Sequence, residues 1–379
     1  MTGWTLVTGD FVTTGGMDRA NYALAEYLAA SGRPVELVAH RVAPELAARP
    51  NVTVRVVPKP LGAYALGRFP LAWAGAEHGR VRLAAGGRVV VNGGNALVAD
   101  VNWVHYVHAA YRPTAAGSWR NRLKARITDR LNRREERRAV RAARVVVCNS
   151  EVTRRAMIDK LGVRPERAVT VYYGCDAAKF HPATDADRAA LRTKLGWPAD
   201  RPVVAFVGAL GDRRKGFDTV FAAWRELSKS PDWDAVLVVV GTGAELPLWE
   251  RRAADAGLTD RVRFLGFRSD VPDLLRAADA LVSPTRYEAY GLGVHEALCC
   301  GLPAIVSAGA GVAERYPADL ADLLLPDPES AADLAARLRH WRLTPDAYRR
   351  RVAPFSEALR AGTWDAMARN FLRAVGEAT

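Results

Sequence analysis

Two glutamates in the carboxyl-terminal half of the chain have a spacing that could hold a sugar-linked anion. Glu288 and Glu296 lie in the stretch Y-E-A-Y-G-L-G-V-H-E-A-L-C-C-G-L-P, residues 287–303. We expect a loop and then a helix that stops at Gly301, with Glu288 in the loop and Glu296 on the helix. Exposed N–H groups at a helix start attract anions such as a diphosphate, and carboxylates accept hydrogen bonds from sugar hydroxyls. The alternative is that both glutamates only solvate a surface helix.

Three consecutive cations form a second candidate group. Arg213, Arg214 and Lys215 lie in G-A-L-G-D-R-R-K-G-F-D, residues 208–218, between an expected strand at 203–207 and a helix that begins near Phe217. Cations at this edge of a sheet would neutralise a diphosphate leaving group. The alternative is a solvated turn.

Two histidines lie three positions apart in N-W-V-H-Y-V-H-A-A-Y, residues 102–111. His105 lies within a strand that we expect at 102–107 and His108 directly after it, and no carboxylate accompanies them, so we predict no metal there. A structural histidine is the alternative for each. The four cysteines, Cys148, Cys175, Cys299 and Cys300, do not have the spacing of a metal site, so we infer no disulfide and no zinc. We expect Cys148, Cys299 and Cys300 to be buried.

The elements that must position these residues alternate between strand and helix. In the first half we expect strands at 4–8, 35–39, 52–57, 89–92 and 145–149 and helices at 17–30, 71–84 and 151–161, the last capped by Ser150. Such a βαβ order predicts a parallel sheet. Gly15 and Gly16 lie in the loop that leaves the first strand, at the edge where open α/β sheets bind ligands. A simple tight turn is the alternative.

The second half repeats this alternation, with strands expected at 203–207, 235–240, 262–265, 280–283 and 304–307. Thr344 and Pro345 have the residue types of an N-cap and a first helical position, and we expect mostly helix from there to Val375. Since 379 residues exceed one ordinary core, the fold class we predict is α/β with two domains.

The string S-P-x-x-Y-E-x-Y-G-L-x-x-x-E-A-L-x-C-G-x-P, together with R-K-G-F-D, resembles the retaining family-4 glycosyltransferases of the GT-B architecture. The resemblance implies two Rossmann-like domains that face a cleft, with residues 1–182 on the acceptor side and 183–350 binding the nucleotide sugar. A helix in 351–379 would pack back on the first domain. The implied reaction moves a hexose, with retention, from a nucleoside-diphosphate sugar to a hydroxyl of a glycolipid, polysaccharide or natural-product acceptor, without a metal or other cofactor.

The resemblance also implies roles for residues of the second domain. Glu296 would bind the ribose hydroxyls and Glu288 the donor sugar, while Lys215 with Arg213 or Arg214 would stabilise charge on the β-phosphate. Further nucleotide-sugar contacts are expected at Gly208, Arg268, Tyr290, Gly291 and Leu292. For Arg268, a solvent-exposed arginine is an equal alternative. Many relatives carry an arginine at the position of Ala209, and either Arg213 or Arg214 could supply that charge.

In the first domain the resemblance places Gly15 and Gly16 near the donor diphosphate and His105 near the reacting carbon. His108 is the weaker candidate, on the acceptor side. The family's usual asparagine is Tyr173 here, which leaves the contact made by that position open.

The net charge of +13 is concentrated in residues 119–144, where eleven Lys or Arg face three acids. Trp119, Leu123, Ile127 and Leu131 form an apolar stripe among these arginines, so the helix could lie on an anionic membrane surface. The alternative is a solvated helix packed on its own domain. No nucleic-acid-binding motif is present. With no apolar run of membrane-spanning length and no signal peptide, we expect a cytoplasmic protein that could be peripheral at the inner face of the membrane.

Two other functional classes remain open from the sequence. One is a non-catalytic nucleotide-sugar sensor of the two-domain binding-protein type, which would bind the donor without releasing a nucleoside diphosphate. The other is a peripheral membrane adaptor that uses the arginine-rich helix.

Overall fold

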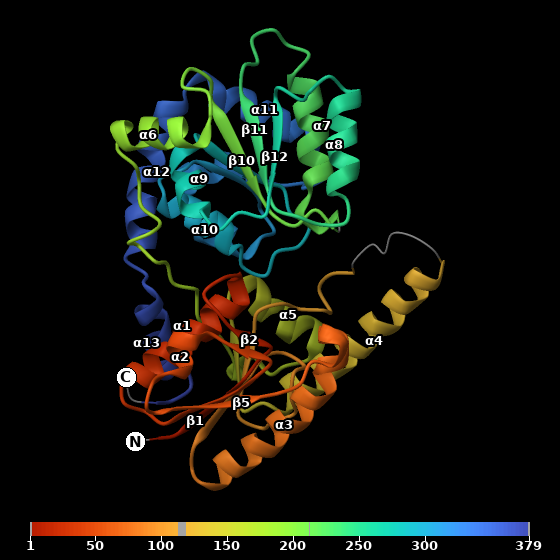
Figure 1. Ribbon diagram of the computed structural model, residues 1–379, viewed down its shortest axis with the longest axis vertical. Helices are drawn as coiled ribbons and strands as arrows, with labels where there is room; N and C mark the ends of the chain where they lie inside the picture. Colours follow the sequence, from red (N-terminus) through yellow and green to blue (C-terminus); the bar gives the residue numbers. More distant parts are fainter. Residues whose placement is uncertain (1, 113–118, 212, 378–379) are drawn as a thin grey trace. The chain divides into compact units, whose positions relative to one another are not determined.

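The chain divides into two compact units, each built on its own parallel sheet (Figure 1). The computed structural model describes residues 2–112, 119–211 and 213–377, and the side chains of these ranges except at 119–122. Among these residues, unit 1 holds 2–112, 119–174 and 363–377, and unit 2 holds 175–211 and 213–362. Residues 113–118, next to the predicted basic helix, and the side chain of Trp119 lie outside the description.

Unit 1 contains a seven-stranded sheet in the order β5-β3-β1-β6-β7-β8-β9, with all neighbours parallel. Its strands are short and rich in valine, and the central ones are buried on both faces, as in α/β proteins whose helices cover both sides of a sheet. Their bounds are β1 Trp4–Val7, β3 Val35–Ala39, β5 Val52–Val56, β6 Arg88–Val91, β7 Val101–Val104, β8 Val145–Cys148 and β9 Ala168–Thr170. A separate two-stranded pair joins β2 (Asp10–Phe11) to β4 (Arg41–Val42).

The helices of unit 1 connect these strands. They are α1 Gly16–Ala30, α2 Pro44–Ala47, α3 Tyr64–Ala84, α4 Trp119–Ala142, α5 Glu151–Leu161 and α13 Trp364–Ala374, with short 3₁₀ turns at Pro60–Gly62 and Pro165–Arg167. The hydroxyl of Ser150 accepts a hydrogen bond from Thr153 N at 3.0 Å, so the predicted N-cap of α5 is confirmed. The prediction for α3 was too short, because the helix continues through Pro70. Proline removes one helical hydrogen bond, and here the carbonyl left without it belongs to Leu66, an exposed residue that water can reach.

Unit 2 contains a six-stranded parallel sheet in the order β12-β11-β10-β13-β14-β15. The order runs outward from β10 in one direction and then reverses at β13, which is the arrangement of the Rossmann fold. The strands are β10 Val203–Val207, β11 Val236–Val240, β12 Val262–Gly266, β13 Ala280–Ser283, β14 Ala304–Ser307 and β15 Leu324–Leu325. Unit 1 reverses in the same way between β1 and β6.

The helices of unit 2 are α6 Asp185–Leu195, α7 Phe217–Leu227, α8 Leu246–Asp255, α9 Val271–Ala277, α10 Leu292–Cys299, α11 Ala331–Leu343 and α12 Pro345–Arg360. Three 3₁₀ segments, η3 Arg213–Lys215, η4 Gly311–Arg315 and η5 Ala318–Leu323, complete the unit. Thr344 flanks α12 and Pro345 is its first residue, as predicted, although the Thr344 side chain makes no capping hydrogen bond.

The helical carboxyl-terminal segment is two helices rather than one. The chain leaves the helical conformation between α12 and α13 at Gly362, and α13 then belongs to unit 1, where it contacts α1. The predicted fold, two Rossmann-like domains with a C-terminal helix that returns to the first, is confirmed. None of the helices in the described part of the chain combines the length and apolar character that crossing a bilayer requires.

Candidate active site

In unit 2 the predicted site residues follow two neighbouring strands at the point where the strand order reverses. The cationic loop, residues 208–216, follows β10, and the loop with Glu288, residues 284–291, follows β13. Arg286 N donates to Arg214 O at 2.8 Å, and the Thr285 hydroxyl lies 3.0 Å from the same carbonyl. Because open α/β sheets bind ligands outside the carboxyl ends of strands at such a reversal, the two loops form one candidate site.

Gly216 allows the two loops to approach each other closely. Its φ of +72° is in the left-handed region, and a Cβ at this position would lie 1.9 Å from Pro284 O. Only glycine satisfies both conditions, which explains the glycine in the R-K-G-F-D string.

Lys215, Arg214 and Glu288 form the charged centre of this site. The Lys215 ammonium pairs directly with the Glu288 carboxylate, and Arg214 Nη1 lies 3.6 Å from Glu288 Oε2. Arg214 also donates to the carbonyl of Tyr287 at 3.3 Å. The three side chains are only 22%, 20% and 17% exposed, in the order Lys215, Arg214, Glu288. Two half-buried cations held beside one carboxylate can face an anion without first reorganising.

Arg213 lies in a different network on the surface. Its Nε donates to Asp218 Oδ2 at 2.8 Å, and Arg286 also contacts Asp218, at 2.8 and 2.9 Å. Although burial raises the pKa of Asp218, the hydrogen bonds from Arg286 and Arg213 bring it below its ordinary value. Of the two arginines, it is Arg214 that lies beside Glu288, and which of them contacts the donor phosphate stays a prediction.

The helix expected to present N–H groups is α10. Gly291, at its N-cap, has a φ of +108°, and a Cβ there would contact Val312 at 3.0 Å. Leu292 is the first helical residue, and Glu296 is half-buried one turn further on. Gly301 follows the helix with a φ of +75°, so the predicted stop is confirmed.

Tyr290 supports this loop from inside. Its ring is fully buried, its hydroxyl lies 2.6 Å from Nδ1 of His295, and Arg315 donates to that hydroxyl at 3.3 Å. Burial raises the pKa of Tyr290 to about 12, so the hydroxyl remains protonated. Contact between Tyr290 and a nucleotide remains a prediction.

Gly208 and Arg268 lie at the ends of their strands, where the sequence predicts them. A Cβ on Gly208 would lie 3.3 Å from Cγ of Lys215, so glycine leaves room for the lysine stem. Ala209 is exposed beside it. Arg268, after β12, pairs with Asp270 at 2.7 Å, and its side chain is 36% exposed.

Gly15 and Gly16 lie in unit 1 at the start of α1. Gly15 is the N-cap, with a φ of +81°, and Gly16 is the first residue of the helix. Asp18, in the first turn, was not predicted as a site residue. Burial, followed by repulsion from Asp10, raises its pKa to about 6. The signal in the sequence was an acid two residues after a glycine pair.

His105 immediately follows β7, because this strand ends at Val104 rather than at Val107 as predicted. Its Nδ1 lies 2.5 Å from the Tyr173 hydroxyl, and its Nε2 lies 3.4 Å from Nδ2 of Asn21. Burial lowers the pKa of His105 to about 3, so the imidazole is neutral at physiological pH. Tyr173, which stands where the family usually carries asparagine, is thus a hydrogen-bond partner of His105.

His108 is held differently. Its backbone N–H and that of Ala109 donate to the buried Glu136 carboxylate of α4, at 2.9 and 3.2 Å. Burial lowers the pKa of the His108 ring. The sequence did not single out Glu136, because it lies in a helix dominated by arginines.

Comparisons with known proteins cover nearly the whole chain. Residues 14–179 match the family described as Glycosyltransferase Family 4, and residues 187–354 match Glycosyl transferases group 1. A D-inositol 3-phosphate glycosyltransferase from Salinispora tropica is 31% identical over an alignment that is 409 residues long. The alignment covers 98% of this chain and 82% of that protein. The chain belongs to the family-4 glycosyltransferases.

Another relative of this glycosyltransferase is the D-inositol 3-phosphate glycosyltransferase from Salinispora arenicola, 30% identical over 98% of the chain and 88% of the relative. Among solved structures, sucrose-phosphate synthase from Thermosynechococcus elongatus aligns with a TM-score of 0.78 and 22% identity, covering 98% of each chain. WaaG, a glycosyltransferase involved in lipopolysaccharide biosynthesis, aligns with a TM-score of 0.71 and 22% identity, over 98% of this chain and 95% of that one. These structures share the GT-B fold.

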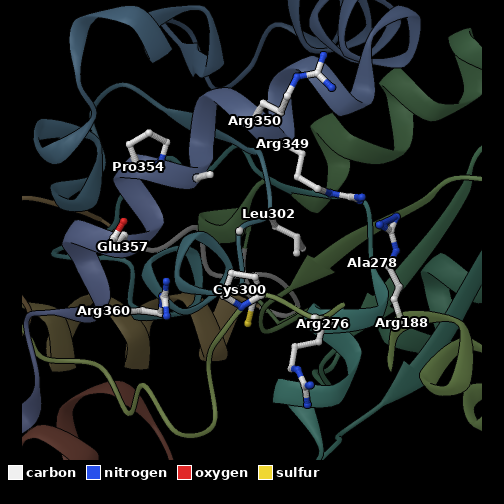
Figure 2. Close-up of a pocket in the computed structure, with 14 residues that line it drawn as sticks. Arg188, Arg276, Ala278, Cys300, Leu302, Arg349, Arg350, Pro354, Glu357 and Arg360 are labelled. Atoms are coloured by element: carbon white, nitrogen blue, oxygen red, sulfur yellow. The ribbon is translucent and has the colours of Figure 1, made fainter. Parts of the chain in front are cut away.

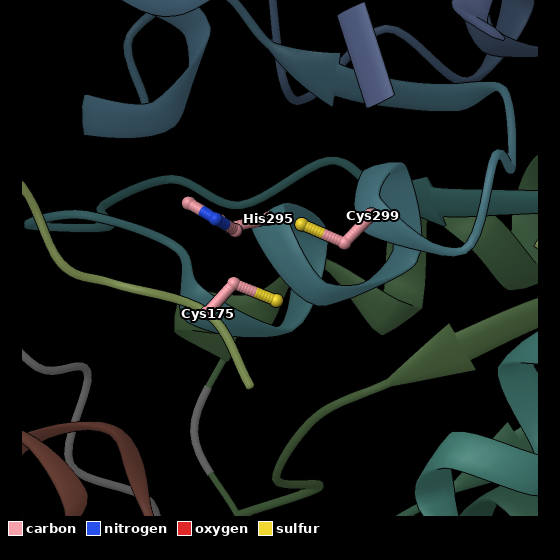
Figure 3. Close-up of side chains that lie close together, drawn as sticks. All are labelled: Cys175, His295 and Cys299. Carbon is pink, nitrogen blue, oxygen red and sulfur yellow. The ribbon is translucent and has the colours of Figure 1, made fainter. Parts of the chain in front are cut away.

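One cluster in unit 2 of the glycosyltransferase was not predicted. Cys175, His295 and Cys299 bring one ligand atom each to within 4.8 Å of one another, and all three are buried (Figure 3). His295 and Cys299 are four residues apart and so lie on one face of α10. A hydrogen bond that the Cys299 thiol donates to Cys175, together with burial, raises the pKa of Cys299, which opposes the thiolate form that binds metals. The expected burial of Cys148, Cys299 and Cys300 is confirmed, and Cys175 is buried as well.

Proposed function

We propose that unit 2 binds the diphosphate of a nucleotide-sugar donor between the Lys215 loop and the start of α10. The observation that carries this proposal is the arrangement of Lys215, Arg214 and Glu288 at the strand-order reversal. Lys215 and Arg214 would stabilise negative charge on the β-phosphate, assisted by the backbone amides near Gly291 and Leu292. These positions agree with the roles that the family resemblance implies.

In the same proposal the two glutamates bind the carbohydrate parts of the donor. Glu296, on α10, accepts hydrogen bonds from the ribose hydroxyls, and Glu288 accepts them from the transferred sugar. Because Glu288 also pairs with Lys215, the two paired loops would align the sugar with the leaving phosphate. Gly208 and Arg268 complete the nucleotide side. In unit 1 we assign Gly15 and Gly16 to the donor diphosphate, His105 to the reacting carbon and His108 to the acceptor.

The reaction that we propose breaks the bond between the anomeric carbon and the β-phosphate oxygen and forms the acceptor ether on the same face. The acceptor hydroxyl gives its proton to the departing phosphate, and a nucleoside diphosphate leaves. His105 is assigned to the neighbourhood of the reacting carbon as a neutral hydrogen-bonding group, since burial lowers its pKa to about 3.

We also propose that transfer of a hexose requires no metal, because the two cations can take the part that a divalent ion has in other enzymes. Turnover should be unchanged after dialysis against EDTA. A loss of turnover that only Mg²⁺ or Mn²⁺ restores would contradict metal independence. A loss that Zn²⁺ restores in the wild type but not in Cys299→Ala would point to the cysteine–histidine cluster.

The variants Lys215→Ala and Glu288→Ala test the assignment. We expect kcat to fall about 100-fold or more in each, with an unchanged circular dichroism spectrum, because an electrostatic contact to the transition state is lost. Lys229→Ala is a matched control, since Lys229 is an exposed lysine of unit 2 whose partner is Glu226. Unchanged turnover in either test variant would remove that residue from the mechanism. Donor binding without release of a nucleoside diphosphate for any acceptor would favour a sensor.

The donor and acceptor can be found in two steps. Thermal-shift screening with nucleoside diphosphates and their sugars should identify the donor, because a ligand that binds only the folded state raises its apparent stability. The acceptor panel should begin with D-inositol 3-phosphate, which the names of two relatives specify. Release of the nucleoside diphosphate only in the presence of an acceptor would identify it.

Peripheral attachment to an anionic membrane is a second proposal, favoured by the surface of unit 1. On α4, Leu123, Ile127 and Leu131 are 49%, 51% and 42% exposed among the arginines. On α3, Phe69 and Trp73 are also exposed, and Arg68 of this helix donates to Asn132 of α4 at 2.9 Å. Apolar side chains together with excess positive charge fit an anionic lipid surface.

Vesicle sedimentation tests this attachment. We expect the protein to sediment with phosphatidylglycerol vesicles and not with phosphatidylcholine vesicles. The double variant Leu123→Ser/Ile127→Ser should lose binding, whereas Leu343→Ser, which changes an exposed leucine of unit 2, should keep it. Equal binding to both kinds of vesicle, or none to either, would contradict the proposal.

A further inference from the structure

Unit 2 contains a pocket at the edge of its sheet opposite the candidate active site. The pocket has a volume of about 440 Å³, and its lining includes Ala278 and Leu302, which lie two residues before the starts of β13 and β14. The active-site loops instead follow the carboxyl ends of β10 and β13. Since the two ends of a parallel strand lie on opposite edges of the sheet, this pocket is distinct from the donor site.

Arginines dominate the lining of this pocket (Figure 2). They come from α6, α9 and α12, and a single glutamate, Glu357, accompanies them. The five arginines are Arg188, Arg276, Arg349, Arg350 and Arg360. We call this set the arginine pocket.

The nearest buried carboxylate is already shared. Asp279 pairs with Arg188 and Arg192, contacts Arg349 at 3.3 Å, and accepts a hydrogen bond from Val203 N at 2.7 Å. Burial, followed by repulsion from Arg349 and Arg192, lowers the pKa of Arg188 to about 10, and the attraction of Asp185 and Asp346 is too weak to reverse this. One carboxylate cannot neutralise three guanidinium groups, so the wall of the pocket keeps excess positive charge.

Two other lining arginines have hydrogen-bond donors without an acceptor. The Nε atoms of Arg276 and Arg360 are buried and have no hydrogen-bond partner within the described part of the chain. A buried donor left unsatisfied destabilises the fold, and more so when the group is charged. Such donors on two elements around one cavity fit an acceptor that comes from outside the protein.

We propose that the arginine pocket is a second ligand site of this glycosyltransferase, which binds the phosphate groups of a small phosphorylated molecule. Guanidinium groups donate paired hydrogen bonds to phosphate oxygens, and their charge is not lost at physiological pH. The volume falls within the range of small-molecule sites. The donor of the transfer reaction is not the occupant, because its diphosphate is assigned to the opposite edge of the sheet.

The fold provides a physical connection between the two sites. Helix α10 begins at Leu292, in the candidate active site, and Cys300 and Gly301, directly after its end, line the arginine pocket. An anion bound there therefore contacts the end of the same helix whose beginning is assigned to the donor diphosphate.

Isothermal titration of the full-length protein with inorganic pyrophosphate tests this site. We expect the double variant Arg276→Gln/Arg360→Gln to bind pyrophosphate at least tenfold more weakly than the wild type, because the donors without acceptors are removed. Arg339→Gln, an exposed arginine of α11 outside the pocket, should bind like the wild type. Should the double variant fail to fold, Arg350→Glu changes an exposed lining residue and should also weaken binding tenfold.

The variant Lys215→Ala separates this proposal from the assignment of the donor site. Pyrophosphate binding that survives Lys215→Ala but not the double variant supports the arginine pocket, whether or not transfer is lost in Lys215→Ala. Binding that is lost in Lys215→Ala and kept in the double variant would overturn it. It would also be overturned if the wild type bound no pyrophosphate, or bound only phosphatidylglycerol vesicles.

Discussion

The hydroxyl of Tyr173 lies 2.5 Å from Nδ1 of His105, at a position where the family usually carries asparagine. Asn149 donates to the same hydroxyl at 3.2 Å and to the carbonyl of His105 at 3.2 Å. The Tyr173 hydroxyl therefore holds one side of the His105 imidazole, and the Asn149 amide holds that hydroxyl in place. We therefore propose that Tyr173 positions the His105 ring.

Removing this hydroxyl should affect turnover more than binding. In Tyr173→Phe we expect kcat to fall about tenfold, which corresponds to about 1.4 kcal/mol, with KM nearly unchanged. The imidazole ring of His105 would remain buried but would lose the hydrogen bond that fixes its orientation. Because burial lowers the pKa of His105 to about 3, the profile of kcat between pH 5 and 8 should show no histidine titration in either protein.

Steady-state kinetics with the identified donor and acceptor would measure both effects, and Tyr172→Phe serves as the neighbouring control. An unchanged kcat in Tyr173→Phe would mean that the hydroxyl does not position His105. A histidine titration near pH 6.5 would show that the imidazole is not buried during turnover.

At the residue scale, the sequence predicted candidate side chains but not the partners that they contact in the fold. The motif predicted Glu288 and Lys215 as separate contacts, but their ion pair joins positions 73 apart in the chain. Likewise, Arg276 and Arg360 lie in no motif, and only the packing of α9 and α12 brings their guanidinium groups to one cavity. Residue type and local spacing indicate chemistry, whereas partners depend on tertiary contacts.

At the scale of elements, the turn that closes the cationic loop depends on Gly216. In Gly216→Ala, a methyl group would meet Pro284 O in a backbone conformation that side chains rarely adopt. We expect a loss of roughly 1–3 kcal/mol in the free energy of unfolding, together with weaker donor binding as the two loops separate. Urea unfolding followed by circular dichroism would measure the loss.

Gly293→Ala is the matched control for this change. It replaces a glycine inside α10 where a Cβ would meet no atom within 4 Å, so we expect no loss and about 0.5–1 kcal/mol of stabilisation from helix propensity. Equal stabilities of the two variants would contradict the steric account of Gly216.

Helix α4 contains a buried acid that responds to pH. Burial raises the pKa of Glu136 from 4.5 to about 7, although backbone donors at His108 and Ala109 oppose the shift. Between pH 4.5 and 7, Glu136 therefore keeps its proton in the folded state, whereas the same carboxyl has released it in the unfolded state. Its contribution to stability is complete below pH 4.5 and is lost as the pH rises to 7.

The variant Glu136→Gln should remove this dependence. Relative to it, the wild type should lose on the order of 3 kcal/mol in free energy of unfolding between pH 4.5 and 7, since one pKa unit corresponds to about 1.36 kcal/mol. Denaturant unfolding at a series of pH values measures the difference. Parallel profiles for the two proteins would show that Glu136 is ionised in the fold throughout this range.

The elements themselves were largely predictable, because each arises from a local pattern. Buried strands are runs of valine bounded by glycine or polar residues, and the start of α5 at Ser150 and the stop of α10 at Gly301 follow from capping preferences. The start of α3 was not predictable in this way, since Pro70 suggested a boundary that the helix passes. The break between α12 and α13 separates helices of different units, and the local pattern does not contain that division.

At the scale of the whole molecule, α13 completes unit 1. Its buried face includes Met367, Phe371 and Leu372, and Phe371 packs against Trp103 of β7 with ring centres 4.9 Å apart. Beyond the helix, Glu377 pairs with Arg88 of β6 at 2.6 Å. The last helix of the chain is therefore a component of the first sheet's core.

Deletion of residues 363–379 should consequently destabilise unit 1 rather than unit 2. We expect the truncated protein to expose the apolar side of α1, bind the dye ANS and aggregate. Limited proteolysis followed by mass spectrometry should show early cleavage within residues 2–174 and protection within unit 2. A truncated protein that stays monomeric and resists cleavage in unit 1 would contradict this role for α13.

The chain passes between the two units at residues 174–175 and 362–363, and these two crossings lie close together. The described part of unit 2 begins at Cys175 and ends at Gly362, and the N–H of the first donates to the carbonyl of the second at 2.9 Å. On the unit 1 side, a Cβ on Gly174 would lie 2.4 Å from Trp364 N, so these two ends also meet. The second Rossmann-like unit is thus inserted into the first at one point. A gene in which codons 175–362 are replaced by a short glycine linker should encode a self-standing first module, and the excised part should be expressible as one uninterrupted polypeptide.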